Sequence, residues 1–330
     1  MTASPRLPAA QLLDLSGTWR QQIDPTNVGR ADHWPARTLT GSITLPGSLE
    51  ESRIGDPITV ETKWTGGIID RSWFTAPEYA PYREPGHIKV PFWLQPETHY
   101  MGAAWFQREV DVPRDWQNHR LVLTLERPHW KTALWLDGQE IGSNDALSVA
   151  HVYDLGVNVS PGRHTLTIRV DNTFDPDIGV NSHSVSDHTQ GNWNGIVGRI
   201  ALAATSPVWT DDVRVDADFV TRTARVRGVL HNATGHGARG QTAFTVEAGR
   251  GAIAPGTSPV SQDFDTSARE LPFAIELPLG PQVRQWDEFT PALYHLKVDV
   301  RGAAAEASFA DEQAVAFGLR TIATHGRQLM

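Results

Sequence analysis

Short runs of alternating apolar and polar residues dominate the chain, and they predict β-strands. The clearest runs span residues 121–125, 132–136 and 165–170, each bounded by Gly, Pro, Asn or Asp. Asp137-Gly138 separates two apolar runs, and this pair is preferred in tight hairpins because both central positions need a positive φ. Only residues 9–15 show a pattern compatible with a short helix. The pattern therefore predicts an all-β protein.

A second group of strand-like segments follows a change in composition near residue 206, where eleven of the 12 tryptophans lie at or before Trp209. Seven short strands separated by turns over a segment of this length are typical of an immunoglobulin-like sandwich. The predicted strands span residues 213–217, 225–231, 241–248, 260–264, 271–277, 294–300 and 305–317.

Residues 50–100 form the least regular stretch, which is rich in Pro, Gly and aromatic residues. A long irregular segment in a compact domain usually carries function, although a purely structural insertion is an equal alternative. We expect an ordered excursion, packed on the first sandwich by Trp64, Trp73, Phe74, Tyr79, Tyr82, Phe92 and Trp93.

The tryptophans fall into two groups by their neighbours. Trp19, Trp105 and Trp135 lie in strands among apolar residues and are predicted to be core side chains. Those in or beside loops are candidates for an exposed surface on which a sugar ring could stack, namely Trp64, Trp73, Trp93 and Trp130.

Composition and charge exclude several classes of protein. With 40% apolar and 20% charged residues the chain is expected to be globular. Its net charge of −9 and the lack of a basic run argue against a nucleic-acid partner. No apolar run approaches the ~20 residues that cross a bilayer, so no membrane partner is expected. The N-terminus lacks the apolar core of a signal peptide, so we expect a cytoplasmic protein unless a leader is missing.

The chain contains no cysteine, which excludes disulfides and thiolate metal sites. His183 and His188, with Asp187 between them, could suggest a metal site, but no third ligand is visible at helical or strand spacing and the loop is polar in any case, so no metal is predicted. Asp171, Asp175 and Asp177 lack the glycine spacing and final glutamate of a calcium loop, and a turn with capping carboxylates is favoured. No cofactor is predicted.

Five motifs occur in one order between residues 15 and 200, and together they identify a family. They are Leu15-Ser16-Gly17-Thr18-Trp19, Leu45-Pro46-Gly47-Ser48, Ala104 to Pro113, Leu134 to Gly142, and Trp193 to Ile200. This set resembles the sugar-binding domain of glycoside hydrolase family 2. The resemblance implies a jelly-roll (galactose-binding-like) sandwich followed by an immunoglobulin-like β-sandwich.

The second half continues the resemblance through Trp286, Pro291-Ala292-Leu293-Tyr294 and Phe317-Gly318-Leu319-Arg320. Leu319 replaces the aromatic residue that is commoner in the family. We expect a sugar-binding-like domain over residues 1–206, an immunoglobulin-like domain over 207–317, and a stub over 318–330 that leads to a missing catalytic barrel. The end of the chain is predicted to be one strand of a hairpin without its partner, as in a truncated parent chain.

The chemistry of glycoside cleavage bears on whether this chain acts alone. Retaining glycosidases use two carboxylic acids about 5 Å apart, and the resemblance places both in the barrel, with one glutamate after an asparagine. The chain contains no Asn-Glu pair. Adjacent acids such as Glu50 and Glu51 would point to opposite faces of a strand. No catalytic residue is predicted, and the isolated chain is expected to be inactive.

The loop over residues 183–194 concentrates hydrogen-bonding groups and one indole, which suits a sugar that offers both hydroxyls and an apolar ring face. The resemblance implies that this loop reaches the barrel mouth, where the family's acidic residue corresponds more closely to Thr189 or Gln190 than to Asp187. A loop that only serves a domain interface is the alternative. The predicted sugar-binding residues are Asp187, His188, Gln190, Asn192, Trp193 and Asn194.

Three functions are compatible with these features. The first is a non-catalytic portion of a family 2 glycosidase, β-galactosidase-like by resemblance, that supports the catalytic barrel and lends a loop to its carbohydrate site. The second is a free-standing carbohydrate-binding module, indicated by the tryptophan-rich first half. The third is an oligomerisation scaffold, in which the partner is a second copy of the chain.

Overall fold

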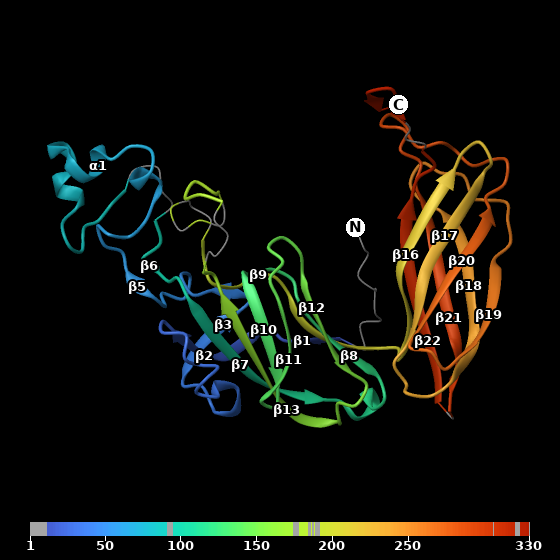
Figure 1. Cartoon of the computed structure of the whole chain (residues 1–330), viewed down its shortest axis with the longest axis horizontal. Helices are drawn as coiled ribbons and strands as arrows, with labels where there is room; N and C mark the ends of the chain where they lie inside the picture. The colour runs from blue at the N-terminus through green and yellow to red at the C-terminus, as the bar shows by residue number, and fades with distance from the viewer. Residues whose placement is uncertain are drawn as a thin grey trace.

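The computed structural model describes residues 12–90, 95–173, 178–183, 186, 188, 192–305, 307–320 and 324–329. Almost all regular structure in these residues is antiparallel strand, which confirms the predicted all-β class. Figure 1 shows two β-sandwiches, with an irregular excursion projecting from the first. No helix of the described residues is both long enough and apolar enough to span a membrane.

The first sandwich, over residues 12–205, has two principal sheets and a small third one. The six-stranded sheet has the order β11-β10-β13-β7-β2-β3, the four-stranded sheet β1-β15-β8-β12, and the small sheet β4-β14-β9. Their bounds are β1 Leu12–Asp14, β2 Gly17–Asp24, β3 Gly41–Leu45, β4 Gly47–Ser48, β7 Ala103–Val112, β8 Arg120–Leu125, β9 Pro128–His129, β10 Lys131–Leu136, β11 Gln139–Asn144, β12 His151–Gly156, β13 Gly162–Asp171, β14 Gly195–Ile196 and β15 Ile200–Thr205. The 3-10 turns η2 (Trp34–Ala36) and η5 (Arg114–Trp116) lie in its connections.

Strand β7 is buried on both faces over its first half, because two clusters cover it. Side chains alternate along a strand, so Phe106 enters the main core between the sheets while Trp105 packs outward with Trp34 and Trp135. The Trp105 and Trp135 ring centroids lie 5.0 Å apart. Trp19, Trp105 and Trp135 are all buried, which confirms the prediction that they are core residues.

The predicted hairpin at Asp137-Gly138 joins β10 to β11. Both residues have positive φ, 50° and 80°, as a tight hairpin requires. Asp137 also accepts a hydrogen bond of 2.7 Å from the amide of Thr165 through Oδ1. The turn is therefore fixed to the neighbouring strand β13.

The second sandwich begins at Val208 and contains all seven predicted strands, each at or near its predicted position. One sheet has the order β16-β17-β20 and the other β19-β18-β21-β22. The bounds are β16 Val208–Asp218, β17 Thr223–Asn232, β18 Ala238–Ala248, β19 Val260–Thr266, β20 Glu270–Pro278, β21 Tyr294–Ala304 and β22 Ala307–Phe317. Its buried apolar side chains form two clusters separate from the core of the first sandwich.

Two segments near the chain ends differ from the sequence interpretation. Leu12–Asp14, whose pattern is compatible with a short helix, forms β1 because it pairs with β15 in antiparallel register, Leu12 opposite Ala203. The strand expected to end without a partner instead forms a hairpin of β23 (Thr324–His325) and β24 (Gln328–Leu329). Gly326 supplies the positive φ between them.

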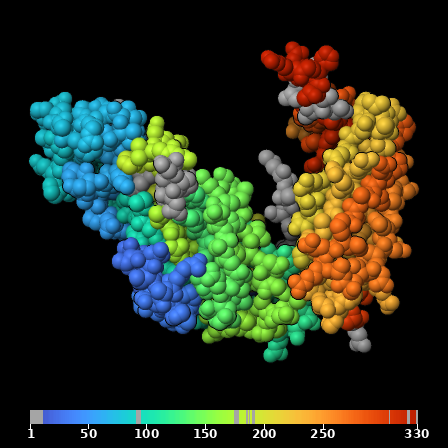
Figure 2. Space-filling model, in the orientation of Figure 1, coloured from blue at the N-terminus to red at the C-terminus, as the bar shows by residue number. Residues whose placement is uncertain are grey.

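The described part of the excursion is ordered as predicted, but Trp64, Trp73 and Phe74 lie outside the core clusters of the first sandwich. It leaves through the short ladder of β5 (Asp56–Pro57) with β6 (Thr98–His99), and contains η3 (Thr65–Gly67), α1 (Ser72–Thr75) and η4 (Pro77–Tyr82). Trp64, Trp73 and Phe74 pack on one another, with centroids 5.0 to 6.0 Å apart. The excursion therefore has its own small core and stands as a separate lobe in Figure 2.

This packing corrects the prediction of an exposed tryptophan surface. Trp64 and Trp73 are only 6% and 2% exposed. The Trp73 indole donates to the carbonyl of Lys89, while half-buried Trp130 donates to the carbonyl of Asp145. Phe92 and Trp93 lie outside the described residues. A free-standing aromatic platform is thus not formed by the described members of this group.

An arginine–tryptophan stack joins the two sandwiches. The Arg120 guanidinium on β8 lies 3.8 Å from the ring centroid of Trp209 on β16, and Trp209 stacks on His231 at 4.9 Å. Arg120 also bonds to Asp154 at 2.8 Å. On the second sandwich beside this stack, burial raises the pKa of Asp311 to about 6, against the opposing effects of the Thr210 amide and Arg120.

We predict that Asp311→Asn stabilises the protein at neutral pH. A raised pKa means that the folded state binds the proton more tightly, so stability falls as pH rises from about 4 to 6 and stays lower above that range. Asn keeps an oxygen for the Thr210 amide without the buried charge. The variant should exceed wild type by on the order of 2 kcal/mol at pH 8, with the difference vanishing near pH 4.

Urea unfolding followed by circular dichroism at pH 4, 6 and 8 measures this effect. Asp265→Asn, at an exposed aspartate on β19 of the same sandwich, is the control and should change little. A stability difference for Asp311→Asn that is independent of pH would contradict the assignment.

Candidate functional site

The excursion and the loop between β13 and β14 emerge from the same end of the first sandwich. A cluster of buried amide groups ties all four of their ends together. Asn172, at the start of the loop, donates from Nδ2 to the Tyr100 carbonyl at 2.9 Å and accepts at Oδ1 from the Gly102 amide at 2.8 Å. The exit of the excursion is thereby fixed to the start of the loop.

Asn194 makes the corresponding links at the end of the loop. Its Nδ2 donates to the Gly102 carbonyl at 2.8 Å, and its backbone carbonyl accepts from the Leu49 amide at 2.8 Å, just before the excursion begins. Both asparagines are fully buried. We call Asn172 and Asn194, with the backbone groups they bond, the asparagine anchor.

Glu50 lies against the anchor, and sequence reasoning considered it only as a neighbour of Glu51. Its Oε2 accepts from the Asn194 amide at 3.3 Å. Burial raises the pKa of the Glu50 carboxyl, and hydrogen bonds from the amides of Glu50 and Asn194 oppose that shift. Its Oε1 is buried without a hydrogen-bond donor among the described residues.

The structure does not bring the predicted sugar-binding residues together at one described surface. Asp187 and Gln190 lie outside the described residues, as does Thr189. Asn194 lies inside the fold as part of the anchor. Trp193 stacks on His129, with ring centroids 4.8 Å apart. Sugar contact by the loop stays a prediction, and His188, Asn192 and Trp193 are the described residues that keep exposed surface for it.

His129, on β9, supports the end of this loop. Burial lowers the pKa of its imidazole, although a hydrogen bond with the Asn192 side chain opposes the shift. This shift favours the neutral form of the ring, on which Trp193 stacks. No sequence motif singled out His129, because its role depends on a strand pairing between β9 and β14.

His188 connects the loop to the excursion. Its backbone carbonyl accepts a hydrogen bond of 3.2 Å from the Thr65 hydroxyl, and its side chain lines a cavity formed mainly by the excursion. Figure 2 shows the described part of the loop, in yellow-green, against the blue and cyan lobe of the excursion. The two segments thus share one surface.

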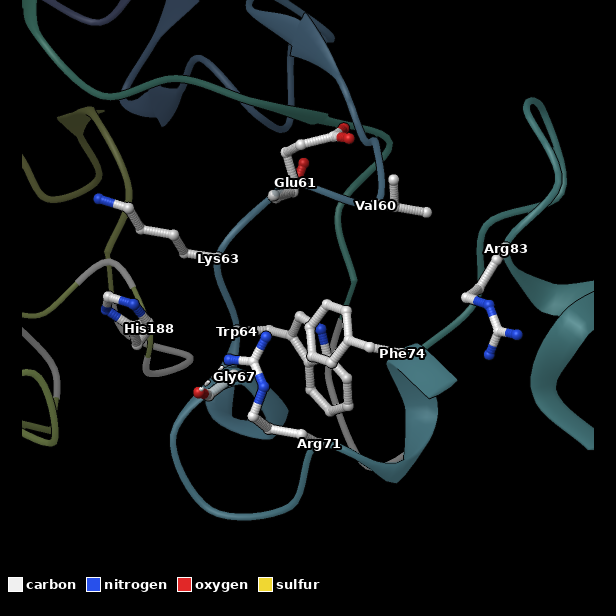
Figure 3. A pocket seen from close by; sticks show the side chains of 10 residues that line it. Val60, Glu61, Lys63, Trp64, Gly67, Arg71, Phe74, Arg83 and His188 are labelled. Carbon is white, nitrogen blue, oxygen red and sulfur yellow. Dashed lines mark hydrogen bonds between the residues drawn. The ribbon is translucent and has the colours of Figure 1, made fainter. Parts of the chain in front are cut away.

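The cavity has a volume of about 610 Å³, within the usual range of small-ligand sites. Figure 3 shows its lining, with Arg71 in front of the Trp64 and Phe74 rings and with Lys63 on the side of His188. The lining residues are Val60, Glu61, Thr62, Lys63, Trp64, Gly67, Arg71, Phe74, Arg83 and His188. The sequence analysis did not single out Lys63, Arg71 or Arg83. The signal that could have found them is the alternation of basic and aromatic residues along the excursion.

Metal binding has no support in the described part of the chain, which contains no group of three His, Cys, Asp or Glu side chains suited to a metal. Asp171 caps a turn as predicted, since its Oδ1 accepts from the Thr173 amide at 2.8 Å. Its Oδ2 is occupied by Arg169 at 2.7 Å. Asp175 and Asp177 lie outside the described residues.

Comparison with known proteins connects this architecture to glycosidases. No family model matches the sequence. A β-glucuronidase of Paenibacillus borealis is 22% identical over 224 residues, which cover 63% of this chain and 31% of that protein. A β-galactosidase of Arthrobacter sp. (strain B7) is 25% identical over 171 residues, which cover 49% of this chain and 16% of that protein.

The solved structures agree on the fold. The β-glucuronidase of Ruminococcus gnavus superposes with a TM-score of 0.61 at 15% identity, covering 99% of this chain and 48% of that chain. Bacteroides uniformis β-glucuronidase 2 gives 0.63 at 15% identity, covering 97% of this chain and 34% of that chain. This chain thus spans about half or less of each of these relatives.

The chain is therefore an all-β protein related to glycosidases. The sequence relatives and the shared fold confirm the resemblance to glycoside hydrolase family 2, through a jelly-roll sandwich followed by an immunoglobulin-like sandwich.

We predict that Asn172→Ala destabilises the first sandwich by about 2–4 kcal/mol, because it leaves the part-buried Gly102 amide and the buried Tyr100 carbonyl without their partner. Urea unfolding followed by tryptophan fluorescence reports mainly this sandwich, since all tryptophans except Trp209 and Trp286 precede Ser206.

Asn181→Ala provides the matched control, because Asn181 lies in the same loop but is exposed. It should change stability by less than about 0.5 kcal/mol. Equal effects of the two substitutions would show that the anchor does not hold the loop.

Proposed function

We propose that this chain is a non-catalytic portion of a family 2 glycosidase. It supports a catalytic barrel and contributes the 183–194 loop, together with the adjoining excursion, to the carbohydrate site. The asparagine anchor supports this role, because it holds the loop and the excursion in one place relative to the sandwich. A loop that positions a substrate must be held in this way.

The proposal that this chain is non-catalytic rests on the distance between the two described carboxyl groups of raised pKa, which lie in different sandwiches. A glycosidase needs two carboxyl groups across one sugar-sized gap, about 5 to 9.5 Å apart. Among the described residues, burial raises the carboxyl pKa of Glu50 and of Asp311. Glu50 lies beside the anchor of the first sandwich, whereas Asp311 lies on β22 of the second.

Among the described residues, neither acid is paired with a second carboxyl group suited to the reaction. No acidic residue is among the main causes of the raised pKa of Glu50. Asp311 has Asp211 nearby, but that repulsion is the smallest of the main influences on its pKa. Asp311 accepts from the Thr210 amide at 3.3 Å and faces Arg120 at the joint between the sandwiches.

The proposed activity of the whole protein is hydrolysis of O-glycosidic bonds. The sequence relatives carry both names, β-glucuronidase and β-galactosidase, and a solved neighbour holds D-glucuronic acid. The β-galactosidase-like activity expected from the motifs therefore shares its support with a β-glucuronidase activity, and both substrate classes belong in the test.

We predict that the pure 330-residue chain does not release 4-nitrophenol from 4-nitrophenyl β-D-galactoside, β-D-glucuronide or β-D-mannoside. Absorbance over several hours at pH 5 to 8 measures this, with buffer alone as the blank. Turnover above the blank would overturn the proposal. The Glu50→Gln variant would then identify the carboxyl group responsible: loss of turnover would point to Glu50, and turnover that persists would point to Asp311.

A further inference from the structure

The cavity of the excursion carries a charge opposite to that of the chain. The protein has a net charge of −9, yet among the described residues that line this cavity three are Lys or Arg and one, Glu61, is acidic. A concave surface lined by one sign of charge concentrates ligands of the opposite sign. The lining therefore favours an anion.

Lys63 is the cation most available to a ligand. Its side chain is exposed, and it forms no ion pair or hydrogen bond with another described residue. In Figure 3 its side chain lies on the side of the cavity where His188 is drawn and extends away from the Glu61 carboxylate. A lysine without an internal partner can give all three of its hydrogen-bond donors to a ligand.

Arg71 adds a second cation that is already positioned. Its Nη1 donates to the Gly67 carbonyl at 3.3 Å, and its guanidinium lies 5.1 Å from the Phe74 ring centroid. These contacts use one of the five N–H donors of the guanidinium. Arg83 is less available, because its Nη1 donates to the carbonyls of Trp73 and Ala76.

Trp64 supplies an independent sign of a missing partner. Its ring lines the cavity and is only 6% exposed, yet its indole Nε1 is buried without a hydrogen-bond acceptor among the described residues. A buried donor without an acceptor costs about 1–3 kcal/mol. An oxygen-rich ligand in the cavity would provide the acceptor.

We propose that this cavity binds the acid group of an acidic saccharide, either a uronate carboxylate or a sulfate ester, through Lys63 and Arg71. Phe74 and Trp64 form the apolar side of the site, which suits the less polar face of a sugar ring. The inference rests on the proposed function in one respect, namely that the ligand is a carbohydrate. Beyond that function, it states that the carbohydrate is negatively charged and that it binds in the cavity of the excursion, away from the asparagine anchor.

Calorimetric titration of the full chain with three probes tests the proposal. Trigalacturonic acid and a sulfated galactotriose represent the two acid groups, and neutral galactotriose is the uncharged counterpart. At least one acidic probe should bind at least about tenfold more tightly than the neutral one, and its affinity should fall with added salt. The tighter of the two acidic probes identifies the acid group.

Substitutions locate the binding. Lys63→Glu should weaken binding of the acidic probe at least about tenfold, and Lys63→Gln should weaken it less. Lys89→Glu is the matched control, because Lys89 is exposed in the same excursion but does not line the cavity. This control should bind the acidic probe as wild type does, and circular dichroism checks that each variant is folded.

A nuclear magnetic resonance readout reports the cavity directly. The Trp64 indole resonance is assigned by its absence in Trp64→Phe, and it should shift when the acidic probe is added. Loss of the shift in Lys63→Glu, with folding retained, would support the site.

Three outcomes would overturn the inference. They are equal affinity for neutral and acidic probes, equal loss in Lys63→Glu and Lys89→Glu, and equally tight binding of single-stranded DNA of matched charge. Where the neutral and acidic probes bind equally and Lys63→Glu leaves both affinities unchanged, the inference of acid recognition is overturned, while carbohydrate binding by the chain is retained. Turnover by the isolated chain is a separate measurement and refutes only the proposed function.

Discussion

The asparagine anchor is the constraint on which the candidate site depends. Asn172 and Asn194 are buried at the end of the central sheet and bond backbone groups at both ends of two long segments. Buried backbone groups must find partners. The β7–β13 and β4–β14 ladders end beside these segments, and beyond them the two asparagine side chains and the Asn194 carbonyl supply the partners. The positions of the loop and of the excursion follow from these bonds.

Given that anchor, the excursion can have a core of its own. Trp64, Trp73 and Phe74 bury one another at close ring distances and do not need the sandwich beneath them. The two arms of the excursion pair with each other in the β5–β6 ladder, and Thr65 bonds the His188 carbonyl of the loop. An element with its own core can present a cavity without disturbing the sheets.

Much of the fold could be predicted from the sequence, because strand alternation and turn residues are local signals. The seven strands of the second sandwich and the Asp137-Gly138 turn follow from such signals. The burial of Trp64 does not, since irregular segments have no period that separates an inward from an outward ring. Glu50 and His129 were missed for a related reason: each gains its environment from residues more than 60 positions away, Asn194 and Trp193.

The burial of the tryptophans changes how recognition by this protein must work. An exposed aromatic platform would bind sugars through ring stacking and would be indifferent to their charge. With Trp64 and Trp73 almost fully buried, the exposed charged groups that line the cavity are Lys63, Arg71 and Glu61, beside half-buried Phe74. Coulombic attraction and charge-assisted hydrogen bonds then outweigh stacking. Because Lys63 has no internal partner to lose among the described residues, its attraction for an acid group is not offset by the breaking of an existing ion pair.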